Sequence, residues 1–482
     1  MEGRGYAGKI LYVDLSSGKS WSEPLNNEVA YALIGGKGLG AYLLFRYLKP
    51  NTDPLSPDNI LIFATGPLTG TIAPTGNRFC VVTKSPLTGT FLDSHCGGSL
   101  GISLKKAGYD ALVIKGKATA ISILVVDGDS VEVAEAENLK GLSTVEVADR
   151  LKEKLGEDFS IASIGPAGER RSLIATIQND LRSAGRGGSG AVMGSKNLKA
   201  IAVRGEKAVR VHDPRAFRRA AWYAHRLVKM HEMTARLLPT YGSANILLTV
   251  NEVGALPSYY FKSGVFSKAE EVSGESWRSE IWVRDVACTY CPIACSKVTM
   301  LDHEEWGRIV VDGPDYETIW AFGPNCGVSD KAAIARANQL CDLYGVDTIS
   351  AGNVVAYLMR CFEHSLISAE DLEGIELRFG DARSMVRAVE KICKCEGVGE
   401  IMARGVRKLA EHLYKVKGDA RLLDLALHVK GLELPAYEPR AAYGMALGYA
   451  TADRGACHLR GYTASQELLG YGGGADPLSP IG

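Results

Sequence analysis

The sequence predicts an α+β fold in which a β-rich N-terminal domain, residues 1–209, is followed by mostly α-helical domains. In the first 200 residues the apolar side chains form short runs, most with Gly or Pro close by, as in buried strands joined by tight turns. Asp213-Pro214 then forms a good N-cap and first-turn pair, and apolar residues after it recur at helical spacing. The expected domains are 1–209, 210–417 and 418–482.

Short apolar runs predict the strands of the first domain. Lys9–Leu15 alternates like a half-buried strand and runs into a Ser-Ser-Gly turn, which is typical of a hairpin. A helix is expected over Thr144–Leu155, and a strand that ends in a turn over Ser163–Gly168. Four further apolar runs predict buried strands: Asn59–Ala64, Phe79–Thr83, Ala111–Lys115 and Ala120–Val126.

Glycine-rich loops punctuate the same domain. Gly66–Thr71 and Ser85–Thr90 are near-copies, which favours either two similar loops facing one site or two unrelated turns. Pro74–Arg78, His95–Gly98 and Arg182–Gly194 follow, and glycine amides beside Arg or Lys are suited to phosphate. None of these loops matches the Walker A or Rossmann pattern. Together they indicate a large anionic cofactor.

The remainder of the chain is expected to be mostly helical. Helices are predicted over Phe217–Met230, Asp330–Gly345, Ser384–Cys393 and Gly399–Tyr414 from their spacing and end residues. The histidines on or near these helices lack metal-ligand spacing and are interpreted as structural: His225, His231, His364 and His412.

Composition excludes several classes of protein. Lys+Arg and Asp+Glu both number 55, which argues against nucleic acid or an anionic membrane as a partner. No stretch reaches the ~18 apolar residues of a membrane span, and the N-terminus lacks an apolar signal core. A cytoplasmic protein is expected. Its eleven cysteines then indicate thiols and metal ligands rather than disulfides.

The densest chemistry lies in the C-x-x-C-x-x-x-C run of Cys288, Cys291 and Cys295. A zinc ribbon would need a second C-x-x-C pair or a His pair at finger spacing, and neither follows. A [4Fe–4S] cluster commonly takes three close cysteines and a remote fourth, so it fits better. The alternative is a chance group of buried thiols.

Acidic segments interrupt the amphipathic pattern of the helical part. Gly313–Thr318, Asp342–Asp347 and Lys430–Arg440 place carboxylates among apolar residues, where burial is costly without a donor. The aspartates of the second segment bracket a glycine at a helix end, so they either accept from a heterocycle N–H or cap the helix. Asp453–Arg460 adds a thiol, an imidazole and two guanidinium groups.

Over essentially its whole length the chain resembles the tungsten-containing aldehyde:ferredoxin oxidoreductase family. The resemblance implies tungsten or molybdenum between two pterins, a [4Fe–4S] cluster, oxidation of aldehydes to carboxylic acids, and ferredoxin as electron acceptor. The β-rich domain would bind the pterin. The resemblance rests on seven segments: Gly66–Gly70, Ala73–Arg78, Thr83–Gly89, Gly185–Ala200, Cys288–Cys295, Asp342–Asp347 and Gly431–Tyr437.

The resemblance assigns roles residue by residue. Arg78 matches an arginine between cluster and pterin, and His95 matches the position of an Asn near an ion, expected to be Mg²⁺, that links the pterin phosphates. Glu317 and His458 match the acid and the imidazole close to the metal. The clustered cysteines match three cluster ligands. The remaining cofactor contacts are Arg182, Ser183, Ala184, Gly185 and Arg186 on the phosphate side, and Asp342, Val346 and Asp347 at a pterin-binding helix end.

One feature of the family pattern is missing. In the family, a second D-x-x-G-L-C motif supplies the fourth cluster cysteine and holds the second pterin. The third domain of this chain is expected to be truncated before that motif. Either the chain is a truncated or split gene product, or Cys326, Cys341 or Cys457 substitutes. The alternative function is a cluster-carrying electron-transfer or scaffold subunit without a competent tungsten site. No E-x-x-H marks the dimer contact of some family members, so homodimerisation stays open.

Overall fold

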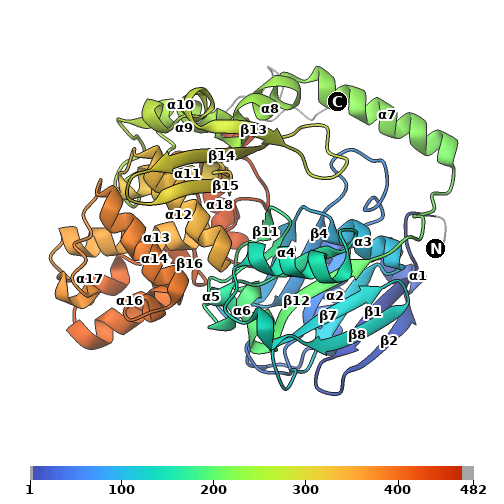
Figure 1. Cartoon of the computed structure of the whole chain (residues 1–482). Helices are drawn as coiled ribbons and strands as arrows, with labels where there is room; N and C mark the ends of the chain where they lie inside the picture. Colours follow the sequence, from blue (N-terminus) through green and yellow to red (C-terminus); the bar gives the residue numbers. More distant parts are fainter. Residues whose placement is uncertain (1–3, 469–482) are drawn as a thin grey trace. The chain divides into compact units, whose positions relative to one another are not determined.

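A computed structural model describes residues 4–468 of the chain (Figure 1). The chain folds into two units. The first contains the residues up to Ala235, together with Ala287–Ala294 and Asp342–Asp347, and the second contains the rest of the described chain. No helix in the described range has the length and apolar composition needed to cross a membrane.

A mixed six-stranded sheet opens the first unit. Its strand order is β2-β1-β6-β3-β4-β5, and β1 pairs antiparallel with β2 from Lys9↔Pro24 to Asp14↔Lys19, which confirms the predicted hairpin. The strands are β1 (Lys9–Asp14), β2 (Lys19–Pro24), β3 (Leu61–Thr65), β4 (Phe79–Lys84), β5 (Phe91–Cys96) and β6 (Ala111–Lys115).

A second six-stranded sheet follows, in the order β11-β10-β9-β12-β7-β8. Buried side chains from both sheets, among them Phe63 and Ile201, form one core with residues of helices α3 (Leu100–Ala107) and α6 (Ser189–Ser195). The strands are β7 (Ser122–Asp127), β8 (Ser130–Glu135), β9 (Ser160–Ser163), β10 (Ile177–Asn179), β11 (Arg182–Ala184) and β12 (Leu198–Arg204).

Helices cover the outer faces of the two sheets. Leu39 and Leu43 of α2 (Gly36–Tyr47) pack on the first sheet, and Val147 and Leu151 of α4 (Thr144–Leu155) pack on the second. The predicted bounds of α4 are confirmed, because Ser143 and Glu146 close a capping box at its start. The other helices of this unit are α1 (Asn27–Leu33), α5 (Pro166–Glu169) and α7 (Pro214–Met230).

The second unit is mainly helical, as predicted, but it also contains a three-stranded antiparallel sheet of β13 (Trp282–Val286), β14 (Ser296–His303) and β15 (Gly307–Asp312). Its helices are α8 (Leu238–Tyr241), α9 (Leu247–Glu252), α10 (Gly274–Glu280), α11 (Tyr316–Phe322), α12 (Lys331–Tyr344, whose last three residues belong to the first unit), α13 (Thr348–Glu363), α14 (Ala382–Lys394), α15 (Gly399–Met402), α16 (Gly405–Lys417), α17 (Arg421–Asp424), α18 (Tyr443–Thr451) and α19 (Ala464–Glu467). A short hairpin joins β16 (His428–Val429) and β17 (Leu432–Glu433).

Three expectations are corrected. The strand expected over Ser163–Gly168 ends at Ser163, and Pro166–Glu169 form the short helix α5. The single helix expected over Gly399–Tyr414 is divided into α15 and α16, and Gly405 has a φ of +79° at the break. The near-copies Gly66–Thr71 and Ser85–Thr90 lie at opposite ends of β4, since the first precedes that strand and the second follows it. The interpretation of two loops facing one site is therefore wrong, and they are separate turns.

Candidate functional site

The first two cysteines of the cluster motif lie in the first unit beside an arginine. The Nε of Arg182 lies 3.3 Å from the Sγ of Cys288, and a turn brings the Cys291 amide to the Cys288 carbonyl at 2.9 Å. A positive charge beside a sulfur stabilises a thiolate, the form that ligates metals. A Cβ on Gly97 would lie 3.0 Å from the Cys288 Sγ, so a larger residue there would press against that sulfur.

Arg78 lies at the same end of the first sheet, immediately before β4. Its Nη2 donates to the carbonyl of His95 at 3.3 Å, and Asn77 donates to the Thr289 carbonyl at 3.5 Å. Next to His95, burial raises the pKa of the Cys96 thiol, which Arg78 partly offsets. Arg78 is thereby held close to the segment that carries the cluster cysteines.

The segment Asp342–Asp347 joins the first unit although helix α12 leads into it. Val346 forms an antiparallel bridge with Ala175, and the Asp347 amide donates to the Ile174 carbonyl at 2.9 Å. The Nε of Arg186 lies 3.4 Å from a carboxylate oxygen of Asp347, and both side chains are buried. The predicted phosphate loop and the predicted pterin-binding helix end are thus adjacent.

The phosphate loop itself contains a buried polar atom without a partner. Among the described residues the hydroxyl of Ser183 makes no hydrogen bond, whereas the carbonyl of Ala184 accepts from Ser189 at 3.1 Å. Gly187 and Gly188 follow with φ values of +87° and +82°. A Cβ on either residue would lie 2.4 Å from its nearest neighbour, so the loop requires glycine there.

A buried carboxylate faces an imidazole in the second unit. Glu317 lies in α11, whose first turn is capped by Asp315, and its Oε2 accepts from the Ala436 amide at 3.0 Å. Its Oε1 lies 3.9 Å from the Nε2 of His458. The two residues expected from the sequence to act close to a metal are therefore neighbours.

Tyrosines that the sequence analysis did not assign surround this carboxylate. The hydroxyls of Tyr437 and Tyr462 lie 2.8 Å apart, and Tyr449 donates to the Tyr437 carbonyl at 3.3 Å. Burial raises the pKa of Tyr316, Tyr437 and Tyr462, and the charge of Glu317 adds to each shift. These hydroxyls stay protonated. Tyr316 and Tyr437 lie in segments that the sequence analysis singled out, but the sequence showed neither their ring contact nor the proximity of Tyr437 to Glu317.

The candidate fourth cluster ligands are all buried in the second unit. The thiol of Cys326 donates to the Ala321 carbonyl at 3.3 Å, and burial raises its pKa. The Sγ of Cys457 accepts from the Nε of Arg454 at 3.1 Å. Cys341 is buried within α12, and Cys295, the third cysteine of the motif, is exposed.

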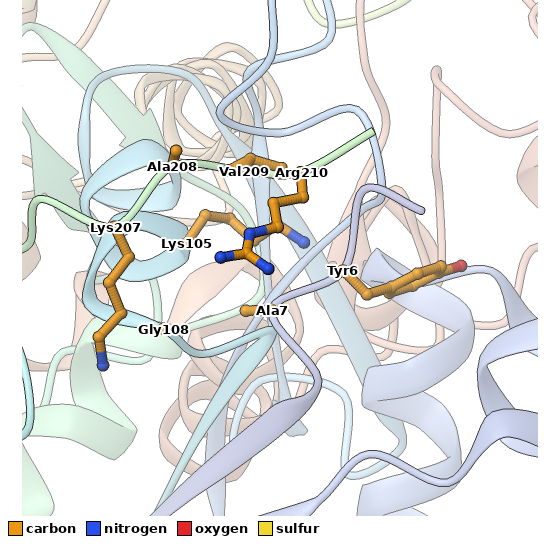
Figure 2. Close-up of a pocket in the computed structure, with 8 residues that line it drawn as sticks. All are labelled: Tyr6, Ala7, Lys105, Gly108, Lys207, Ala208, Val209 and Arg210. Carbon is orange, nitrogen blue, oxygen red and sulfur yellow. The ribbon is translucent and has the colours of Figure 1, made fainter. Parts of the chain in front are cut away.

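A cationic cavity of about 270 Å³ lies elsewhere in the first unit (Figure 2). The charges of its lysines are matched by acids, because Lys105 contacts Asp110 at 2.5 Å and Lys207 contacts Asp129 at 2.8 Å. Burial lowers the pKa of Lys105, which Asp110 opposes. None of the predicted site residues lines the cavity, whose walls are Tyr6, Ala7, Lys105, Gly108, Lys207, Ala208, Val209 and Arg210.

Comparisons with known proteins cover nearly the whole chain. The pattern described as "Aldehyde ferredoxin oxidoreductase, N-terminal domain" matches residues 10–205, and that described as "Aldehyde ferredoxin oxidoreductase, domains 2 & 3" matches residues 219–481. Proteins named tungsten-containing aldehyde ferredoxin oxidoreductase are similar: that of Pyrococcus horikoshii is 44% identical over 478 residues, and that of Pyrococcus furiosus 42% over 476. Each alignment covers 98% of this chain and 77% of the relative.

Two more distant relatives widen the comparison. The aliphatic sulfonate oxidoreductase, WOR-like subunit, of Pyrococcus furiosus is 30% identical over 492 residues, covering 97% of this chain and 77% of that protein. The solved active site complex BamBC of benzoyl coenzyme A reductase has a TM-score of 0.78 at 28% identity, covering 90% of this chain and 66% of that one. The chain is thus an oxidoreductase. It belongs to the aldehyde ferredoxin oxidoreductase family.

Proposed function

We propose that the protein oxidises aldehydes to carboxylic acids with a tungsten–bis-pterin cofactor and passes the electrons through an iron–sulfur cluster to ferredoxin. Relatives 40–44% identical over 98% of the chain carry the name tungsten-containing aldehyde ferredoxin oxidoreductase. The observation that carries the proposal is the buried Glu317 carboxylate, 3.9 Å from the imidazole of His458. That pair suits proton transfer at a carbonyl.

The first unit offers a fitting cradle for an anionic pterin. The Ser183 hydroxyl is buried without a partner among residues 4–468, so a phosphate oxygen or a bound cation would satisfy it. Left-handed glycines follow in the same loop, where backbone amides approach an anion most closely. Asp342 and Asp347 would accept from ring N–H groups, and a carbonyl from Ser183 or Ala184 would bind the Mg²⁺ between the phosphates.

The cysteine motif supports an iron–sulfur cluster. Thiolates are the ligands of such clusters, and three cysteines within eight residues supply most of a [4Fe–4S] set. Arg78 and Arg182 would lower the electrostatic cost of its negative charge, since Arg182 already contacts Cys288. The fourth ligand would come from Cys326, Cys341 or Cys457, or from a further protein segment.

The side chains around Glu317 have separate tasks. When bound, the metal–pterin group supplies two-electron chemistry that side chains lack. His458 donates a hydrogen bond to the aldehyde oxygen, which polarises the carbonyl. Glu317 accepts a proton from the attacking water. The protonated tyrosines exclude bulk water, and aldehyde plus water yields a carboxylic acid, two electrons and two protons.

A second candidate is a subunit of a larger redox complex. Two similar proteins are named as a WOR-like subunit and as part of the complex BamBC, which favours this alternative. In that case the chain would transfer electrons to a partner polypeptide or serve as its scaffold.

The test is anaerobic purification followed by elemental analysis and an aldehyde-dependent assay with ferredoxin. The enzyme proposal predicts tungsten with about four irons per chain and ferredoxin reduction that requires aldehyde. Iron without tungsten or molybdenum would favour the subunit alternative. Tungsten and iron without any aldehyde turnover would contradict the proposed substrate class.

A further inference from the structure

Three side chains of different ligand chemistry converge on one face of the first sheet. Asp93 and His95 are two residues apart in β5, so both point to the same side. Cys80 in β4 is the cross-strand partner of His95, which places its thiol on that side too. Their ligand atoms all lie within 4.8 Å of one another. Two hydrogen-bonded strands therefore hold a Cys, a His and an Asp in fixed positions.

The distances suit a tetrahedral metal ion. The Nε2 of His95 lies 3.7 Å from the Sγ of Cys80 and 3.1 Å from the Oδ2 of Asp93. Zinc bonds of about 2.0–2.3 Å place neighbouring ligand atoms of a tetrahedron roughly 3.4–3.6 Å apart. Both of these separations lie within a few tenths of an ångström of that spacing, and the ligand atoms of Cys80 and Asp93 lie within 4.8 Å of each other.

Burial and charge favour a cation at this position. Asp93 is fully buried and Cys80 almost so, and a buried carboxylate needs a compensating charge. Lys37 supplies part of it from α2, with its Nζ 3.7 Å from the Asp93 Oδ1. The side chains of His95 and Lys37 are 27% and 32% exposed, which leaves an entry path from solvent. Gly40 brings α2 close, since a Cβ there would lie 2.5 Å from Val82.

We propose that Cys80, Asp93 and His95 bind a divalent transition-metal ion of the zinc type, with the fourth position open to water. A thiolate and an imidazole select zinc-like ions over Mg²⁺ or Ca²⁺, which prefer all-oxygen sites. The site is separate from the Cys288 motif. It also gives His95 a task other than the expected contact with a phosphate-linking ion, because its Nε2 already faces Asp93 and Cys80. The proposal does not depend on aldehyde oxidation.

The first experiment measures zinc bound by the anaerobically purified full chain after dialysis against ZnCl₂ and removal of free metal. Cys80→Ser, Asp93→Asn and His95→Gln are each expected to lose about one zinc per chain relative to wild type. Cys361→Ser removes a buried thiol in α13 and is the matched control. It is expected to bind as much zinc per chain as the wild type. Equal zinc in wild type and all three variants would overturn the proposal.

A measurement on the unmodified chain guards against variants that fail to fold. Anomalous diffraction from zinc-soaked crystals, collected above and below the zinc edge, is expected to give a peak among the three side chains. A peak at Cys288–Cys295 alone, or none, would show that the trio is a hydrogen-bond network neutralised by Lys37. Lys37→Met removes the competing charge and is expected to tighten zinc binding, whereas weaker binding would contradict the argument.

Discussion

Replacing Glu317 by Gln tests the chemistry at the centre of the proposed active site. The amide has the shape of the carboxylate, so its Oε1 still accepts from the Ala436 amide, 3.0 Å from the carboxylate Oε2. It loses only the negative charge and the basicity on the side that faces His458. General-base catalysis contributes about 10²–10⁴-fold, or ~2.7–5.4 kcal/mol in the barrier. We expect kcat to fall by that factor.

The stability cost of the same substitution is small. A hydrogen bond to a charged group contributes about 1.5–3 kcal/mol and one to a neutral group about 0.5–1.5 kcal/mol. The difference for the bond to Ala436 is therefore about 1 kcal/mol. The variant should fold and retain wild-type tungsten and iron, so the loss would lie in turnover and not in assembly.

The assay follows aldehyde-dependent ferredoxin reduction at saturating substrate, with tungsten, iron and thermal unfolding measured on the same samples. Glu433→Gln is the matched control, because Glu433 is also a buried glutamate and accepts hydrogen bonds from Ser350 and the Val406 amide, away from His458. It should lower the unfolding temperature without the fall in kcat. An unchanged kcat in Glu317→Gln would refute the general-base role.

Three further predictions concern the first unit. Asp347→Asn leaves the buried Arg186 without its acid and should lower the free energy of unfolding by about 3 kcal/mol in urea denaturation. Gly97→Ala places a Cβ 3.0 Å from the Cys288 Sγ and should lower the iron content of anaerobically purified protein. Burial lowers the pKa of Lys196 to about 8. Because the unfolded chain keeps that proton until about pH 10.4, wild-type stability should gain about 2 kcal/mol between pH 8 and 10, and Lys196→Met should lack this gain.

Each of these predictions has an outcome that contradicts it. Equal urea midpoints for wild type and Asp347→Asn would mean that the ion pair contributes nothing. Full iron in Gly97→Ala would show that the Cys288 loop can move aside. Gly66→Ala controls for a general glycine effect, because a Cβ there meets nothing within 4 Å and its φ is not positive. Parallel pH profiles for wild type and Lys196→Met would show that Lys196 has the same pKa in the folded and unfolded states.

Much of the fold was predictable because local signals agreed with the tertiary structure. The helix Thr144–Leu155 has its capping box and apolar stripe in the sequence, and Lys9–Asp14 has its apolar run and turn. The half-buried alternation expected for that strand is wrong, because Ile10–Val13 are all buried. The sequence did not predict β13, because most of its side chains are exposed and apolar and polar residues do not alternate along it. This segment is a strand because it pairs with β14. The break at Gly405 depends on a positive φ that spacing does not encode.

By itself the sequence determined the ligand chemistry: three cysteines in one motif, glycine loops with arginines, and an acid and an imidazole far apart in the chain. Only the tertiary structure decided which of these groups meet. A β-bridge and a buried ion pair bring Asp347 to Arg186, and strand register brings Cys80 to His95. The physical reason is that residue types set what a side chain can bind, whereas pairing and packing between distant segments set where it lies.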